Sequence, residues 1–236
     1  MKKSRLLGAV CTHLLTFFSR LRLLWGLPIL FVGWTGVTNA TTVTNGSFET
    51  GDFSGWVTQD LTAPFFPLSV QTLGAANTFS WPWSSTPTDG NFTAFHGFDG
   101  DGTSGPNPIR VAQDITVTAD QTRIAFDYRG AWDLLEFGAA QNRIFDVNIE
   151  VAGGGANLAN FNILTAVAGT AVDDTGQLSG WVDLSPFAGQ TVHLAFDWFV
   201  PENFTGPAQF QLDNVHAVPI PAAAWLFGSG LLGLIG

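Results

Sequence analysis

The chain has 236 residues, of which 46% are hydrophobic and 12% charged, a composition typical of a folded protein rather than a disordered one. Five of its nine cationic residues lie in the first 22 positions, so residues 41–236 carry four arginines against all 19 acidic residues, a net charge of −15. This charge argues against nucleic acid and anionic membrane faces as partners, and with Cys11 as the single cysteine the sequence excludes a disulfide framework and a cysteine-ligated zinc site.

Residues 1–40 have the pattern of an export signal. A cationic stretch that ends at Arg22 is followed by an apolar run over residues 23–34 and by small residues up to Ala40. We expect a signal helix here and cleavage after Ala40, which makes Thr41 the first residue of the mature chain. An uncleaved membrane anchor is the alternative, but the apolar run is shorter than the roughly 20 residues that span a bilayer.

Residues 41–217 are long enough for one domain with a sizeable core, and hydrophobic residues recur there with a period of two. The alternating runs are 111–117, 124–129, 145–151, 192–198 and the run that begins at Phe210. Between them lie Gly and Pro residues that break strands, and residues 41–217 contain no long apolar stripe of helical period. The pattern predicts an all-β fold, an antiparallel β-sandwich of roughly nine to eleven strands.

Residues 74–108 depart from this alternation and predict loops around at most one or two short strands. Trp81 and Trp83 flank a proline in this segment, and Trp132 follows a predicted turn. With Arg129 and Asp133 as hydrogen-bonding groups, these rings are candidates for a glycan-stacking platform, and the alternative is that they cover the rim of the sandwich. Three other tryptophans occupy strand positions and are expected in the core: Trp56, Trp181 and Trp198.

Catalytic motifs are absent from the sequence. The histidines of the domain have neither metalloprotease spacing nor a nucleophile elbow beside them; they are His96, His193 and His216. His193 and Asp197 share a strand face and are expected to be solvated. Asp99 and Asp101 lie close together between glycines, which indicates either a cation-binding loop or, more simply, a solvated turn. No pair of carboxylates is singled out for glycoside hydrolysis.

The segment from Val43 to Trp56 contains Asn-Gly-Ser-Phe-Glu at 45–49 and a Gly-Trp pair at its end. Further matching segments follow in order: 113–117, 124–128, 182–192, 194–196 and 210–215. Together they resemble the galactose-binding-like jelly rolls and related carbohydrate-binding modules, which implies this fold without fixing a ligand. Many such jelly rolls hold a structural calcium ion. The resemblance implies that Ca²⁺ is bound by Glu49 and Asp213, with backbone carbonyls near Gly51 and Asp52.

Residues 218–236 are apolar throughout, and Val218, Pro219 and Pro221 open the segment. This segment is similar to the PEP-CTERM sorting signal of Gram-negative bacteria, in which a proline motif, a hydrophobic helix and a basic tail are recognised by an exosortase. The sequence departs from that pattern because it ends at Gly236 with no basic tail, which indicates a truncated or incomplete anchor.

The export pattern, the alternating strands and the two resemblances together imply an exported, non-catalytic protein of a Gram-negative cell envelope or extracellular matrix. We expect it to bind or organise extracellular polysaccharide in a biofilm, to meet an exosortase-type enzyme and to be associated with the membrane at least transiently through its C-terminal segment. Two alternatives stay open. One is a polysaccharide-modifying hydrolase or lyase, and the other is a structural matrix protein without affinity for glycans.

Overall fold

The computed structural model of the chain describes residues 40–62, 64, 66–75, 83–97, 108–136, 138–201 and 205–219. Most of the predicted export and sorting segments, together with Trp81, Asp99, Asp101 and Pro221, therefore lie outside the described residues. The described part forms eleven strands and one 3-10 turn. They are β1 (Val57–Gln59), β2 (Ser69–Thr72), β3 (Phe92–His96), β4 (Pro108–Thr116), β5 (Arg123–Asp133), β6 (Arg143–Val151), β7 (Asn157–Ala166), β8 (Ala171–Val172), β9 (Leu178–Asp183), η1 (Ser185–Phe187), β10 (Thr191–Phe199) and β11 (Ala208–Val218).

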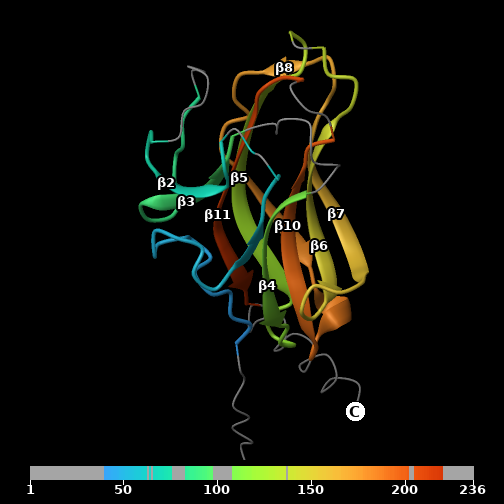
Figure 1. The fold of residues 1–236 in the computed structure, drawn as a ribbon. Helices are drawn as coiled ribbons and strands as arrows, with labels where there is room; N and C mark the ends of the chain where they lie inside the picture. The colour runs from blue at the N-terminus through green and yellow to red at the C-terminus, as the bar shows by residue number, and fades with distance from the viewer. Residues whose placement is uncertain are drawn as a thin grey trace, which may run out of the picture. The chain divides into compact units, whose positions relative to one another are not determined.

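Two antiparallel sheets form a sandwich, so the predicted fold class is confirmed (Figure 1). Sheet 1 has the strand order β1-β4-β10-β6-β7. Sheet 2 has the order β2-β3-β11-β5-β8, and β9 also pairs with β5. Apart from the consecutive pairs β6–β7 and β2–β3, neighbours in each sheet come from distant parts of the chain. Side chains on one sheet face therefore approach one another although they are far apart in sequence.

The core lies between the two sheets and is built from the apolar positions of the alternating strands. Phe126 of sheet 2 packs edge-on against Phe196 of sheet 1, with ring centroids 5.1 Å apart, and Phe145 stacks on Phe196 at 6.3 Å. Full burial of one such side chain stabilises a fold by about 1.5–3 kcal/mol. Trp56 and Trp198 are buried in this core, as predicted.

Trp181 does not belong to the core, and the prediction that placed it there is wrong. Its side chain is 57% exposed, whereas the next residue, Val182, is 1% exposed. Successive side chains of a strand point to opposite faces, so the two cannot both face the core. Gly180 shares the inner face with Val182, and a Cβ atom added to it would lie 2.7 Å from the Phe126 ring.

Residues 83–91 form a strap that covers part of the outer face of sheet 2. The Trp83 ring stacks on Phe95 at 5.6 Å and is only 2% exposed. The backbone N–H of Thr86 donates to the side-chain oxygen of Gln211 at 2.8 Å, and the Gln211 amide donates back to the Thr86 carbonyl at 2.6 Å. Arg129 donates to the Ser84 carbonyl at 2.9 Å. These contacts tie the strap to β11 and β5.

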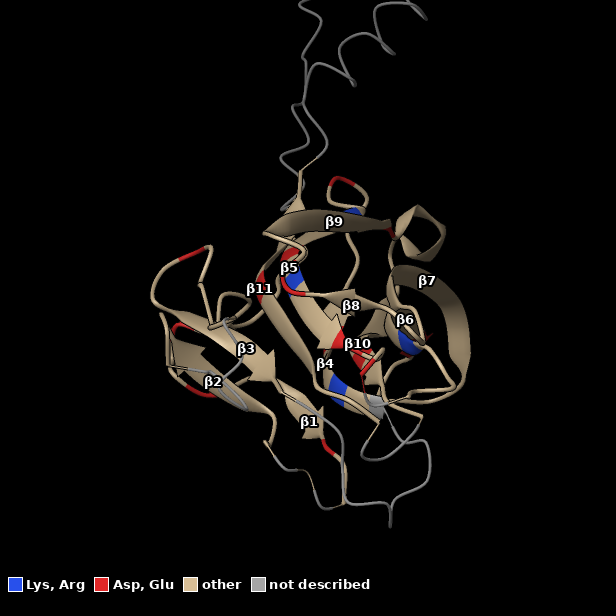
Figure 2. Ribbon diagram, turned by 90° about the horizontal axis from the view of Figure 1, so that it is seen from above, with Lys and Arg blue, Asp and Glu red and all other residues tan. Residues whose placement is uncertain are grey.

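Strand β11 runs through Val218, the first residue of the predicted sorting segment, and Pro219 is the last described residue of the chain. Among the residues that the structure describes, none lies in a helix with the length and hydropathy that a membrane crossing requires. The four arginines after residue 40 lie on β4, β5 and β6, amid acidic residues that are spread over strands and loops (Figure 2).

Candidate functional site

The outer face of sheet 1 carries three rows of mostly polar side chains that cross four strands. Strand register places these residues opposite one another, because the polar members of each alternating strand point away from the core. The first row is Arg110, Asp197, Asp146 and Asn162; the second is Ala112, Ala195, Asn148 and Asn160; the third is Asp114, His193, Glu150 and Asn157. These twelve residues are called the polar face below.

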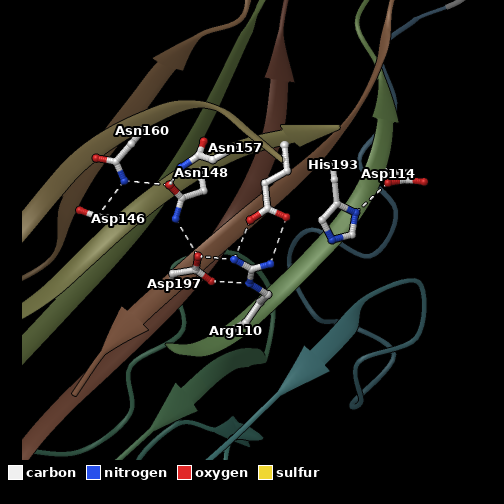
Figure 3. A network of polar contacts seen from close by, with 9 residues as sticks. Arg110, Asp114, Asp146, Asn148, Asn157, Asn160, His193 and Asp197 are labelled. Carbon is white, nitrogen blue, oxygen red and sulfur yellow. Dashed lines mark hydrogen bonds and ion pairs between the residues drawn. The ribbon is translucent and has the colours of Figure 1, made fainter. Parts of the chain in front are cut away.

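Arg110 holds two carboxylates of the polar face at once (Figure 3). Its Nε and Nη2 atoms donate to Asp197, each at 2.7 Å, and its Nη1 and Nη2 atoms donate to Glu150 at 3.1 and 2.7 Å. The row between those of Arg110 and Glu150 carries only methyl groups at Ala112 on β4 and Ala195 on β10. The Asp197 and Glu150 side chains are only 7% and 8% exposed. The hydrogen bond to Asp197 is the main cause that raises the pKa of Arg110.

A chain of amide side chains extends this cluster over β6 and β7 (Figure 3). Asn148 donates to Asp197 at 2.7 Å, and its own carbonyl oxygen accepts from Asn157 at 3.0 Å and from Asn160 at 2.8 Å. Asn160 also donates to Asp146 at 2.9 Å. An ionised carboxylate can only accept hydrogen bonds, so Asn148 and Asn160 must turn their amide nitrogens toward Asp197 and Asp146. Among the residues that the structure describes, none donates a hydrogen bond to the side-chain oxygens of Asn157 and Asn160, so these acceptors are open to an incoming donor.

His193 and Asp114 form a second cluster on the polar face. The Nδ1 atom of His193 lies 2.7 Å from Asp114 Oδ1, which also accepts the backbone N–H of Gly153 at 2.9 Å. The Gly153 hydrogen bond is the main cause that lowers the pKa of Asp114, and the His193 contact adds to it. The expectation that His193 and Asp197 are merely solvated is wrong, because each is nearly buried and bonded to a different partner.

The residues predicted to hold calcium bind the strap instead. Glu49 accepts the backbone N–H groups of Asn91 and Phe92 at 2.7 and 2.8 Å. Asp213 accepts the backbone N–H groups of Thr88 and Asp89 at 2.7 and 3.2 Å. Both carboxylates therefore anchor backbone N–H groups in the structure, and calcium binding by Glu49 and Asp213 stays a prediction from the sequence alone.

The two backbone positions assigned to the same ion lie in a tight turn. Gly51 has a positive φ of 76°, the conformation that favours glycine. The carbonyl oxygen of Asp52 accepts the side-chain amide of Asn45 at 3.0 Å, and its carboxylate accepts the hydroxyl of Thr50 at 2.7 Å. These contacts stabilise the turn that precedes β1.

Burial gives Asp213 an unusual titration. Its side chain is inaccessible to solvent, and this burial raises its pKa from the ordinary 3.8 to about 6, although hydrogen bonds from Thr88, Asp89 and Asn214 oppose the shift. The folded protein therefore binds this proton more tightly than the unfolded chain does. The resulting stabilisation is fully present below pH 3.8 and is lost as the pH rises through about 6.

We expect Asp213→Asn to remove this pH dependence. Between pH 4 and pH 7, the free energy of unfolding of the variant relative to the parent should rise by up to about 3 kcal/mol, because only the parent must ionise a buried carboxyl group. Urea unfolding of both proteins at several pH values measures this difference. A difference that does not change with pH would contradict the buried titration.

The predicted glycan platform is not assembled in the structure. Trp83, the first residue of the strap, is buried against Phe95, and Trp132 lies within β5, where it is 6% exposed and donates through Nε1 to the Thr170 hydroxyl at 3.0 Å. Arg129 forms paired hydrogen bonds with Asp174 at 2.6 and 2.8 Å. Asp133 accepts two backbone N–H groups of the following turn. Trp83 packs on Phe95 of sheet 2 and Trp132 belongs to the hydrophobic core, so these two rings do not form an exposed stacking surface.

Sequence reasoning missed the residues that hold the polar face together, which are Arg110, Glu150, Asp114, Asn148 and Asn160. The alternation that predicted the strands already placed Asn148 and Glu150 opposite to the core. The missing information was strand order: β4, β10 and β6 are neighbours in sheet 1 although residues 117–142 and 152–190 separate them in the chain.

No protein-family model matches this chain, and no curated protein matches it. Similar solved structures include TmCBM61 in complex with β-1,4-galactotriose, with 14% identity, coverage of 77% of this chain and 100% of that one, and a TM-score of 0.47. The K1 cleaved adhesin domain of Lys-gingipain from Porphyromonas gingivalis W83 is 17% identical, and the match covers 77% of this chain and 99% of that one with a TM-score of 0.47. The apo form of a cyclase from Fischerella sp. is 16% identical, and the match covers 77% of this chain and 97% of that one with a TM-score of 0.47. These similarities concern the β-sandwich alone.

Proposed function

We propose that this domain binds neutral polysaccharide on the polar face of sheet 1 and performs no catalysis. The observation that carries the proposal is the directed chain of hydrogen bonds from Asn157 and Asn160 through Asn148 to Asp197 and Arg110. Because every amide nitrogen is committed inward, the side chains are held in fixed orientations and offer oxygen acceptors outward. A polymer rich in hydroxyl groups supplies the matching donors.

The charge of the polar face supports a neutral ligand. Arg110 is its single fixed cation, whereas it carries four carboxylates: Asp114, Asp146, Glu150 and Asp197. An anionic polymer would be repelled by this excess of negative charge. Nucleic acid and acidic polysaccharide are therefore poor ligands, and uncharged sugars are favoured.

An apolar patch adjoins the polar face and suits the C–H face of a sugar ring. Phe199 and Ile144 are paired in register across β10 and β6, two residues beyond Asp197 and Asp146. The period of two places them on the same outer side, and both are partly buried. Aromatic and aliphatic surface beside hydrogen-bonding groups is the usual composition of small-molecule sites.

A hydrolase is less well supported than a binding protein. Glycoside hydrolysis needs one carboxylic acid that gives a proton and a second carboxylate that acts as base or nucleophile. Asp197 and Glu150 are the paired carboxylates of the polar face, but both accept hydrogen bonds from the same guanidinium. Their oxygens are committed to Arg110, which suits a rigid binding surface.

The cellular setting that we propose follows from the two ends of the sequence. Residues 1–40 would export the chain, and residues 218–236 would serve as a PEP-CTERM-type signal for an exosortase in a Gram-negative envelope. The β-sandwich of residues 41–217 would then meet extracellular polysaccharide. The net charge of −15 after residue 40 suits a soluble exposed domain.

Combined substitution of the exposed amides should weaken glycan binding. We expect Asn160→Ala with Asn162→Ala to reduce retardation by neutral galactan, glucan or mannan several-fold in affinity electrophoresis, because the Asn160 acceptor is lost together with the two amide contacts that orient Asp146. Both side chains are exposed, so the fold should be retained in circular dichroism.

The matched control is Gln190→Ala, which removes an exposed amide from the turn before β10 and should leave retardation unchanged. Alginate, an anionic polymer, should not retard the parent protein. The proposed function fails if the parent migrates freely in every neutral polymer, or if the double variant is retarded as strongly as the parent.

A further inference from the structure

A hollow of about 360 Å³ opens on the polar face between β1 and the turn that joins β6 and β7. Its lining includes Val57 and Gln59 of β1, Arg110 of β4, His193 of β10 and the turn residues Gly153–Gly154. The volume falls within the range of roughly 300–1,000 Å³ that small-molecule sites occupy. The polar face therefore includes a recess large enough for a sugar residue.

The His193 side chain lines this hollow and has one ring nitrogen available. Its side chain is 8% exposed, and Nδ1 is bonded to Asp114. Among the described residues, Nε2 has no protein hydrogen-bond partner. A Cβ atom added to Gly154 would lie 3.6 Å from Nε2, so the absence of a side chain at Gly154 keeps this nitrogen accessible.

The hydrogen-bond partner of His193 Nδ1 determines whether Nε2 of the same ring donates or accepts a hydrogen bond. Asp114 Oδ1 accepts the backbone N–H of Gly153 as well, so an ionised Asp114 needs a proton on Nδ1 of His193. In the neutral imidazole the proton is then on Nδ1, and Nε2 carries a lone pair. A buried lone pair that faces a recess is a specific acceptor for one hydrogen-bond donor.

We propose that the hollow is a sugar-binding subsite in which His193 Nε2 accepts the hydroxyl of one neutral sugar residue. The inference rests on the proposed function and assigns a specificity-determining residue to it. Arg110 does not attract anions here, because its guanidinium is already bonded to Asp197 and Glu150. Asp114 adds a further negative charge, so a hydroxyl donor is accommodated and a carboxylate is repelled.

The test uses the protein labelled with ¹⁵N in its histidines and titrated with methyl β-galactoside and methyl β-glucoside. Long-range ¹H–¹⁵N spectra should show the Nδ1–H form of His193 before addition. Saturation with at least one glycoside should move the Nε2 resonance of His193 and leave that of His216, on the other sheet, in place. His193→Phe should weaken glycoside binding at least tenfold, whereas the control His216→Phe should not.

The outcomes separate this inference from the proposed function. A proton on Nε2 in the free protein, or an unmoved His193 resonance at saturating concentrations of both glycosides, would overturn the subsite. If galactan, glucan or mannan still retards the protein in that case, the proposed function stands. A His193 shift with no retardation by any polymer would support the subsite and contradict polysaccharide binding. The parent spectra decide the inference even if His193→Phe fails to fold.

Discussion

Replacing Arg110 with methionine should lower the free energy of unfolding by about 3–5 kcal/mol, the loss expected when one partner of a buried ion pair is removed. Methionine keeps much of the apolar stem but leaves Asp197 and Glu150 without the cation that both contact at 2.7 Å. The two carboxylates are almost buried, so water cannot replace the guanidinium fully. Urea unfolding at pH 7 measures the loss.

Arg123→Met provides the matched control. The Arg123 guanidinium lies 4.4 Å from the centroid of the exposed Trp181 ring, an arrangement that contributes about 0.5–1 kcal/mol. The control should therefore cost no more than this amount. If Arg110→Met were as mild as Arg123→Met, Arg110 would not be the cation that holds the polar face together.

Gly46→Ala should destabilise the domain by about 3 kcal/mol or more, because the new methyl group would overlap the backbone of β11. A Cβ atom at Gly46 would lie 1.9 Å from the Val215 carbonyl oxygen. The strand cannot easily move away, since the Val215 N–H donates to the Gly46 carbonyl at 2.9 Å. The turn that contains Gly46 would therefore have to move away from β11. Thermal and urea unfolding both report this change.

Gly189→Ala separates this clash from the general cost of replacing glycine. Gly189 has a positive φ of 81° but no heavy atom within 4 Å of an added Cβ, so only the backbone conformation opposes alanine there. We expect a loss of about 1–2 kcal/mol. Equal losses at both glycines would contradict a close contact between Gly46 and β11.

Much of the fold could be predicted because alternation depends on local sequence. The run 192–198 predicted a strand, and the structure has β10 at Thr191–Phe199. The Asn-Gly-Ser-Phe-Glu segment was recognised by resemblance, and the structure shows its physical role. Asn45 and Phe48 both adopt positive φ, Phe48 stacks on Trp56 at 5.6 Å, and Glu49 binds the strap.

The candidate site could not be predicted because it depends on which strands are neighbours. Arg110 and Glu150 are 40 positions apart, and their contact requires β10 to lie between β4 and β6. Alternation also failed for Trp181, because Gly180 gives no hydrophobic signal for the inner face of β9. Trp83 looked like an exposed loop residue, but the hydrogen bonds of Gln211 and Arg129 hold its strap against sheet 2.

The polar face of sheet 1 is the surface that we propose for glycan binding. Backbone amide chemical shifts of the protein, recorded during titration with neutral β-1,4-linked galacto- and gluco-oligosaccharides, test this directly. We expect saturable shifts centred on Asn148, Asn160 and His193, with the amide resonances of β11 and the strap unchanged. Shifts centred on sheet 2, or none with any neutral oligosaccharide at saturating concentration, would contradict it.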